Sequence, residues 1–312
     1  MSRQLVTIFG GSGFVGRHVV RRLAADGWLC RVAVRNPDSA TFLKVDGDPG
    51  QVVPFGADVT DMKSVERAVV GAKRVVNLVG ILYQKGRRTF QRVHVDGAAN
   101  VAKAARAAGV ERLVQMSAIG AAPNSPAAYG RTKAAGEAAA KAAFDEVSIV
   151  RPSVVFGPED DFFNRFAAMA RISPVLPEFP AKFQPVYVAD VASAIARILD
   201  DPDTRGKTYE LGGPRVITFH EFLELVLRVT GRDRPIVAMP MSLAALQATF
   251  LELLPVPPLT RDQLKLLGRD NVVSPDALTL SDLGISPTTM EAVLPTYLHR
   301  YRPQMKQRKR LA

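Results

Sequence analysis

Cysteine and histidine are scarce in this sequence. Cys30 is the single cysteine, so no disulfide can form within the chain, as is usual for proteins of a reducing compartment. It lies in a strand-like run, and we expect it to be a small buried hydrophobic residue. The histidines are far apart and lack the spacing of metal ligands, so the sequence predicts no metal site. These histidines are His18, His94, His220 and His299.

Long apolar runs are also missing. No stretch reaches the roughly 18 apolar residues that a membrane span needs. The nearest, residues 241–254, is interrupted by Gln247 and Glu252, and we expect either a buried helix or an interfacial one. A strand begins by about residue 4. We therefore expect no signal peptide, and a location on the cytoplasmic side of the membrane.

Acidic residues are outnumbered. The chain has 41 Lys and Arg against 30 Asp and Glu, a net charge of +11. No aromatic-basic interleaving or nucleic-acid reader motif accompanies this excess, so no nucleic-acid partner is expected. Residues 297–312 hold six Lys or Arg and no acid. This basic tail indicates either a solvated end or contact with anionic lipid headgroups or acidic subunits.

A glycine-rich turn stands near the start of the chain. The apolar run 5–9 meets Gly10, and glycines recur at Gly13 and Gly16, directly before a helical pattern. This spacing permits a tight strand-to-helix turn, close backbone approach to a pyrophosphate and close packing of helix on strand. The helix start adds free N–H groups and a positive dipole end. The sequence therefore predicts a dinucleotide cradle formed by Gly10, Ser12, Gly13, Phe14, Val15 and Gly16.

Strand-like and helix-like segments alternate through the first half of the chain. Strands are expected at 29–34, 75–79, 113–116 and 147–156, and helices at 97–108 and 128–143. This alternation is typical of an α/β fold with a doubly wound parallel sheet of the Rossmann type. We expect residues 1–157 to form the dinucleotide-binding domain and residues 158–312 a smaller C-terminal lobe. Residues 185–212 should pack back on the first domain.

A second group of residues points to chemistry. Tyr129 and Lys133 are one helical turn apart, so they share a helix face. We expect the ammonium to lower the pKa of the phenol. Ser117, at the end of the preceding strand, is placed to polarise a carbonyl oxygen. The alternative is a surface pair on an ordinary helix.

Arg35 bears on the choice of nucleotide. It follows the second strand, where an acidic residue would accept the ribose 2′-hydroxyl of NAD and a cation suits the 2′-phosphate of NADP. The planar guanidinium is the better phosphate clamp. Asp38 lies close by in the sequence and opposes this interpretation. The sequence favours NADP(H), with NAD(H) as the alternative.

The glycine pattern, Ser117, Tyr129 and Lys133 together resemble the short-chain dehydrogenase/reductase superfamily, in its extended and atypical branches. The resemblance implies further cofactor contacts. Adenine would lie near Asp58 and Val59. The cleft would be lined by residues 78–80, and the nicotinamide would be bordered by residues 151–153. The implied binding residues are Asp58, Val59, Leu78, Val79, Gly80, Pro152 and Ser153, together with Tyr129 and Lys133.

A closer resemblance covers the second half. Residues 151–166, 184–191, 259–263 and 282–285 are similar to the NADPH-binding accessory subunit of respiratory complex I and its bacterial relatives. This implies a nucleotide that is mainly structural and a peripheral position near the quinone site, on the cytoplasmic side of a bacterial inner membrane.

Two other functions remain open at this stage. Ser117, Tyr129 and Lys133 also suit an active NAD(P)-dependent oxidoreductase or a sugar-nucleotide epimerase/dehydratase. Such an enzyme needs a substrate pocket in the second lobe, where no residue cluster indicates one. Phe162, Phe163 and Phe166 are expected in the core or at an interface instead. A nucleotide-sensing regulator built on the same fold is a minor alternative.

Overall fold

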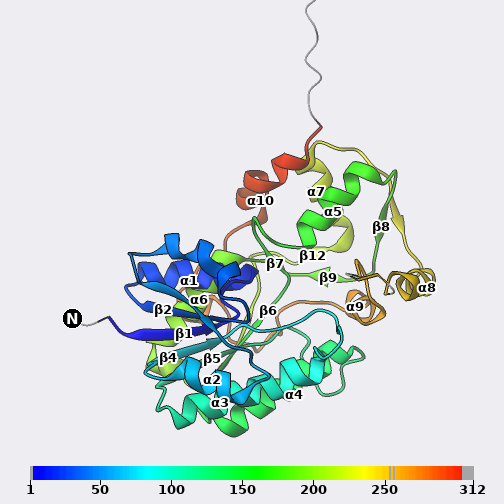
Figure 1. Cartoon of the computed structure of the whole chain (residues 1–312). Coiled ribbons are helices and arrows are strands. Elements are labelled where there is room, and N and C mark those ends of the chain that lie inside the picture. Colours follow the sequence, from blue (N-terminus) through cyan, green and yellow to red (C-terminus); the bar gives the residue numbers. More distant parts are fainter. Residues whose placement is uncertain (1–2, 253, 256, 304–312) are drawn as a thin grey trace, which may run out of the picture.

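The computed structural model describes residues 3–252, 254, 255 and 257–303. Its centre is a seven-stranded sheet in which every neighbouring pair is parallel, in the order β11-β6-β5-β4-β1-β2-β3 (Figure 1). The predicted doubly wound α/β fold is therefore confirmed. The strands are β1 (Leu5–Phe9), β2 (Leu29–Val34), β3 (Val52–Gly56), β4 (Arg74–Asn77), β5 (Arg112–Met116), β6 (Ser148–Pro152) and β11 (Thr208–Leu211).

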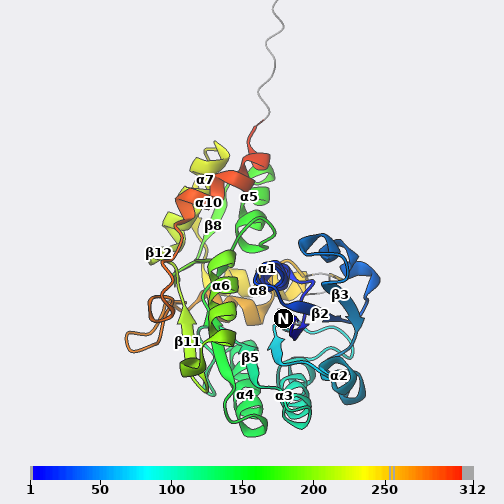
Figure 2. The ribbon, with the colours of Figure 1, turned by 90° about the vertical axis from the view of Figure 1, so that its left-hand side faces the viewer.

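Helices cover both faces of this sheet (Figures 1 and 2). On one face, α1 (Phe14–Ala25) packs against α6 (Val188–Asp200). On the other face, α3 packs between α2 and α4. Their bounds are α2 (Met62–Val69), α3 (Gly97–Ala107) and α4 (Ala128–Ala143). Because both faces are covered, β1 is buried along nearly its whole length and reads as a continuous apolar run.

The expected single strand over residues 147–156 is wrong. The segment divides into β6, which pairs with β5 and β11 in the main sheet, and β7 (Val155–Phe156), which pairs with β10 (Val186–Tyr187). Pro152 is the last residue of β6; it has no N–H to donate, and Ser153 N makes the final bond to Leu211 O of β11. After Pro152, the Ser153 side chain turns to Asn271 instead, and the chain leaves the sheet.

The second lobe is built around a phenylalanine cluster. Phe162, Phe163 and Phe166 on α5 pack against Phe219 and Phe222 on α7, so their expected place in the core is confirmed. The capping residue of α7, Thr218, forms a capping box. The helices of this lobe are α5 (Phe162–Ile172), α7 (Phe219–Thr230), α8 (Met241–Leu251), α9 (Arg261–Leu267) and α10 (Met290–Leu298). Its short strand pairs are β8 (Leu176–Glu178) with β13 (Ile236–Ala238), and β9 (Lys182–Phe183) with β12 (Ile217–Thr218).

Two segments from the second half of the chain join the main sheet and the helices that cover it. Helix α6 packs on α1, and β11 extends the main sheet beside β6. The end of the predicted basic tail, residues 304–312, lies outside the described residues. Within the described ranges, no helix combines the length and apolar character that crossing a bilayer requires.

Candidate functional site

The glycine turn between β1 and α1 has the geometry of a phosphate cradle. Gly10 has φ of 77°, and its carbonyl accepts a hydrogen bond from Gly13 N at 3.0 Å. A Cβ on Gly16 would lie 2.3 Å from Gly10 O and 2.6 Å from Gly11 Cα, so only glycine fits there. Gly13 is exposed at the start of α1, and no side chain caps that helix end. The first N–H groups of α1 are therefore open to an anion.

The side chains of the other predicted cradle residues point in different directions. Ser12 is half-buried within the turn. Phe14 turns toward the junction with the second lobe, since a Cβ on Gly157 would lie 3.3 Å from its ring. Val15 packs against the core beneath the sheet. Only the backbone of Phe14 and Val15 is therefore available to the predicted cradle.

The segment after β4 lies directly beside this turn. A Cβ on Gly10 would lie 3.2 Å from Val79 Cγ2 and 3.4 Å from the carbonyl carbon of Leu78. A Cβ on Gly80 would lie 3.8 Å from Lys133 Nζ. The structure thus brings residues 78–80 between the glycine turn and the lysine, as their predicted role requires.

Tyr129 and Lys133 lie on the first two turns of α4. Lys133 is 7% exposed, and its Nζ donates to Met116 O at 2.9 Å. Burial lowers the pKa of Lys133 to about 8, against the opposing charge of Glu137. Burial raises the pKa of Tyr129 to about 12. The expected lowering of the Tyr129 pKa is therefore wrong, because desolvation of the phenol dominates and the ammonium is directed at a backbone carbonyl.

Ser117 follows β5, next to the carbonyl that Lys133 contacts. Its side chain is 4% exposed, and its Oγ has no hydrogen-bond partner among the described residues. Buried hydroxyls are normally paired, because an unpaired one costs about 1–3 kcal/mol. An oxygen of a bound molecule would satisfy this hydroxyl, so Ser117 and the glycine cradle both fit a bound dinucleotide.

His94 is a site residue that sequence reasoning missed. It lies on the π-helical turn Gln91–Asp96, and its ring meets Tyr129 edge-on at a centroid distance of 5.4 Å. Its Nε2 accepts from Ile81 N at 3.0 Å. Burial, with the nearby Lys133 charge, lowers the pKa of His94 to about 3. The imidazole is therefore neutral, and it ties the segment after β4 to α4.

Asp262 is the second missed residue. Its carboxylate accepts from Ala128 N at 2.7 Å and from Tyr129 N at 2.9 Å. It therefore caps the first turn of α4 from α9, where a negative charge also suits the helix dipole. The sequence shows the capping box between Thr260 and Gln263, but no local signal shows that Asp262 reaches α4.

The residues expected near the adenosine end lie at the ends of β2 and β3. Arg35 is exposed after β2. Burial lowers the pKa of Arg88, and the positive charge of Arg35 lowers it further while Asp58 opposes, so the three groups are neighbours. Asp58 Oδ1 also accepts from the backbone N and the hydroxyl of Thr60. Val59 is 4% exposed and packs into the core. Two guanidinium groups thus share this corner.

Some of the residues expected near the nicotinamide already make contacts with other side chains of the protein. Pro152 is buried at the end of β6, and Ser153 Oγ contacts Asn271 Oδ1 at 2.7 Å. Arg151 forms a two-pronged ion pair with Glu137 of α4, at 2.7 and 2.9 Å, and approaches Glu210. Ser153 and Arg151 therefore brace the lobe junction and α4.

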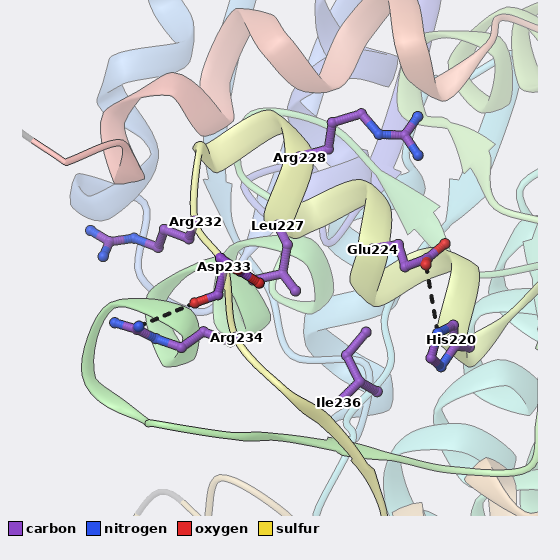
Figure 3. Close-up of a pocket in the computed structure, with 8 residues that line it drawn as sticks. All are labelled: His220, Glu224, Leu227, Arg228, Arg232, Asp233, Arg234 and Ile236. Atoms are coloured by element: carbon purple, nitrogen blue, oxygen red, sulfur yellow. Dashed lines mark hydrogen bonds and ion pairs between the residues drawn. The ribbon is translucent and has the colours of Figure 1, made fainter.

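A separate hollow of about 420 Å³ lies in the second lobe, along α7 and the segment after it (Figure 3). Several of its polar groups are already paired: His220 lies 3.0 Å from Glu178 and 3.6 Å from Glu224, and Arg234 donates to the Asp233 carbonyl. Figure 3 shows Arg228 and Arg232 extending in different directions. The hollow is therefore distinct from the glycine cradle and has no convergent charge.

The fold and the site together define a dinucleotide-binding protein with a Ser–Tyr–Lys arrangement at the carboxyl ends of its strands. The chain belongs to the NAD dependent epimerase/dehydratase family, whose model matches residues 6–212. The predicted superfamily is thereby confirmed.

Relatives that match along nearly the whole of this chain support the narrower resemblance. The chain is 34% identical over 297 residues to the mitochondrial 40 kDa subunit of NADH-ubiquinone oxidoreductase from Neurospora crassa, covering 95% of this chain and 79% of that protein. It is 36% identical over 313 residues to the mitochondrial NADH dehydrogenase [ubiquinone] 1 alpha subcomplex subunit 9 of Arabidopsis thaliana, covering 96% and 78%. A dTDP-glucose 4,6-dehydratase from Streptomyces venezuelae, solved with NAD and TYD bound, superposes with a TM-score of 0.74 at 20% identity over 96% of each chain. That structure supports the fold alone.

Proposed function

We propose that the chain is an NADPH-binding accessory subunit of respiratory complex I, in which the nucleotide is mainly structural. The observation that carries this proposal is the similarity to complex I subunits along 95% or more of the chain, including both lobes. Similarity confined to the glycine cradle would support any dinucleotide-binding protein. The partners proposed are the complex I subunits near the quinone site.

The state of Tyr129 supports a structural nucleotide. With its pKa near 12, the phenol keeps its proton at neutral pH and is a poor general base. A bound nicotinamide nucleotide would supply hydride chemistry, and this phenol is not an activated base for it. Lys133, Ser117 and the glycine turn are placed to hold the ribose and phosphates. Replacing Tyr129 by Phe should therefore leave respiratory function and nucleotide content nearly unchanged.

The preference for NADPH rests on the corner formed by Arg35 and Arg88. Two cations suit a 2′-phosphate, and no acidic residue directly follows β2. Arg35→Asp should weaken NADPH binding by about 10–100-fold, because each charge-assisted contact contributes roughly 1.5–3 kcal/mol. Arg35→Gln removes the charge without reversing it, so its affinity for NADPH should lie between those of the unmodified protein and Arg35→Asp. Equal affinity of the unmodified protein for NADPH and NADH in calorimetric titrations would contradict this preference.

The location that we propose is peripheral, on the cytoplasmic face of a bacterial inner membrane. The relatives named above support attachment to complex I, and the basic residues of 297–312 favour contact with anionic headgroups. Removing residues 303–312 should loosen this attachment while nucleotide binding persists, because the cradle lies in the other lobe.

An active NAD(P)-dependent oxidoreductase or epimerase/dehydratase is the second candidate. The unpartnered Ser117 hydroxyl favours it, because such a donor suits a substrate oxygen as well as a cofactor oxygen. Steady consumption of NADPH with a defined carbonyl or sugar-nucleotide substrate, lost in Tyr129→Phe, would establish this function and displace the first.

A further inference from the structure

Helix α8 carries an unpartnered apolar stripe. Leu243, Leu246 and Phe250 are spaced by three and four residues, so they share one face of the helix, and Leu254 follows four residues later. Their side chains are 54%, 58%, 65% and 49% exposed in that order. Clustered exposure of large apolar side chains on a folded domain marks an interaction site rather than ordinary surface.

The opposite face of α8 is buried against the protein. Ala244 is 1% exposed and Ala248 is 0% exposed, and the helix packs against α9. The helix itself, Met241–Leu251, contains no charged residue. Figure 1 shows α8 at the periphery of the molecule, on the side away from the N-terminal strand. Packing against α9 thus fixes α8 with its apolar stripe facing solvent.

Cations stand beside this stripe. The hairpin that follows β4 is closed by backbone hydrogen bonds between Lys85 and Arg88, and Lys85 Nζ donates to Pro255 O at 3.2 Å. This contact places the exposed Lys85 and Arg87 next to the chain that leaves α8. The nearby carboxylate of Glu252 is already paired with Arg261 at 2.9 Å. The unneutralised charge at the rim is therefore positive.

We propose that the α8 stripe and its cationic rim form a docking surface that inserts into an anionic lipid surface. The apolar side chains of α8 can enter the acyl region while the cations of the neighbouring hairpin, rather than of α8 itself, meet anionic headgroups. A symmetric contact between two copies through α8 would bring the same cationic hairpins together, which opposes it.

This docking also bears on the nucleotide cleft. Asp262 of α9 caps the first turn of α4 at Tyr129, and α9 supports α8 from beneath. The docking surface therefore holds the Tyr129 end of the cleft beside the lipid. The proposal does not require complex I, and vesicles without protein are sufficient to test it.

The test uses the full chain with vesicles of phosphatidylglycerol or phosphatidylcholine. In Phe250→Trp, the emission of the new tryptophan should shift to the blue and be quenched by phosphatidylglycerol with brominated acyl chains. The unmodified protein, whose single tryptophan is Trp28 in the first domain, is the internal control and should show no quenching. Quenching reports insertion, which charge-driven adsorption at the headgroups would not produce.

Flotation of the same vesicles tests the contribution of the stripe. The triple variant Leu243→Gln, Leu246→Gln, Phe250→Gln should lower the vesicle-bound fraction by about tenfold or more, because three large apolar side chains no longer enter the acyl region. The matched control is Ile172→Gln on α5, an apolar residue outside the stripe that is 88% exposed, and it should bind as the unmodified protein does. Lys85→Glu should weaken binding at low salt only.

Three results would overturn the proposal. The first is absence of quenching of the Phe250→Trp variant in phosphatidylglycerol vesicles. The second is equal loss of binding in the triple variant and in Ile172→Gln. The third is self-association in light scattering that disappears in the triple variant while no vesicle binding is seen, which would make a second copy the occupant. Association of these variants with complex I is a separate measurement, and it tests the proposed function rather than the lipid docking.

Discussion

Acidification should destabilise this protein through His94 in particular. The imidazole is 3% exposed, and its Nε2 accepts from Ile81 N, which only an unprotonated nitrogen can do. Its Nδ1 lies 3.1 Å from the hydroxyl of Thr132, which itself donates to Ala128 O. The neutral ring is therefore built into a chain of hydrogen bonds, and a proton has no place on Nε2.

The expected magnitude follows from linkage between protonation and folding. The pKa of His94 is lowered from 6.5 to about 3 in the folded protein. A base whose folded pKa is depressed contributes stability that is present above its unfolded pKa and is lost as the pH falls toward the folded pKa. At about 1.36 kcal/mol per unit, moving from pH 7 to pH 5 should cost about 2 kcal/mol through this one group.

The assay is urea unfolding at pH 7 and pH 5 for the unmodified protein and for His94→Gln, which keeps an acceptor but cannot gain a charge. The variant is expected to lose about 2 kcal/mol less stability on acidification. His299→Gln, at an exposed histidine, is the matched control and should behave as the unmodified protein does. An equal acid-induced loss in all three proteins would refute the reasoning.

Two further predictions concern the glycine cradle and the cap of α4. Gly16→Ala should abolish nucleotide binding, since its Cβ would overlap Gly10 O, whereas Gly268→Ala, where a Cβ would meet only ordinary contacts from 3.6 Å outward, should bind normally in a calorimetric titration. Asp262→Ala should lower the free energy of unfolding by about 0.5–2 kcal/mol, because two N–H groups of α4 lose their acceptor, and Asp262→Asn should recover part of that loss. Unchanged urea midpoints in both Asp262 variants would contradict the capping role.

The features that the sequence predicted well are local ones. The glycine spacing is sufficient for the β1–α1 turn, because Gly16 and Gly10 meet within one tight turn. Strong helix formers are sufficient for α4, whose expected bounds agree with the structure. The strand expected over 75–79 ends at Asn77 instead, where the side-chain oxygen of Asn77 accepts a hydrogen bond from Val79 N. Cys30 is buried as expected, and burial raises the pKa of its thiol to about 12.

The features that could not be predicted depend on contacts across the chain. The phenol of Tyr129 packs against Phe90 and His94, which are far from α4 in the sequence, and burial raises its pKa. Asp262 lies 134 residues from Ala128, so its capping role depends entirely on how α9 docks. The segment 241–254 has apolar residues on every side, and the docking of α9 decides which of them are covered. Periodicity alone could not separate a buried helix from an interfacial one.

The most direct test of the proposed function is sedimentation of the native protein with complex I in mild detergent, followed by acid extraction of the bound nucleotide. Our account predicts that the chain sediments with complex I at physiological salt and carries NADP(H) in a near-stoichiometric amount. A chain that is wholly soluble and absent from complex I fractions would contradict the account and favour a free enzyme.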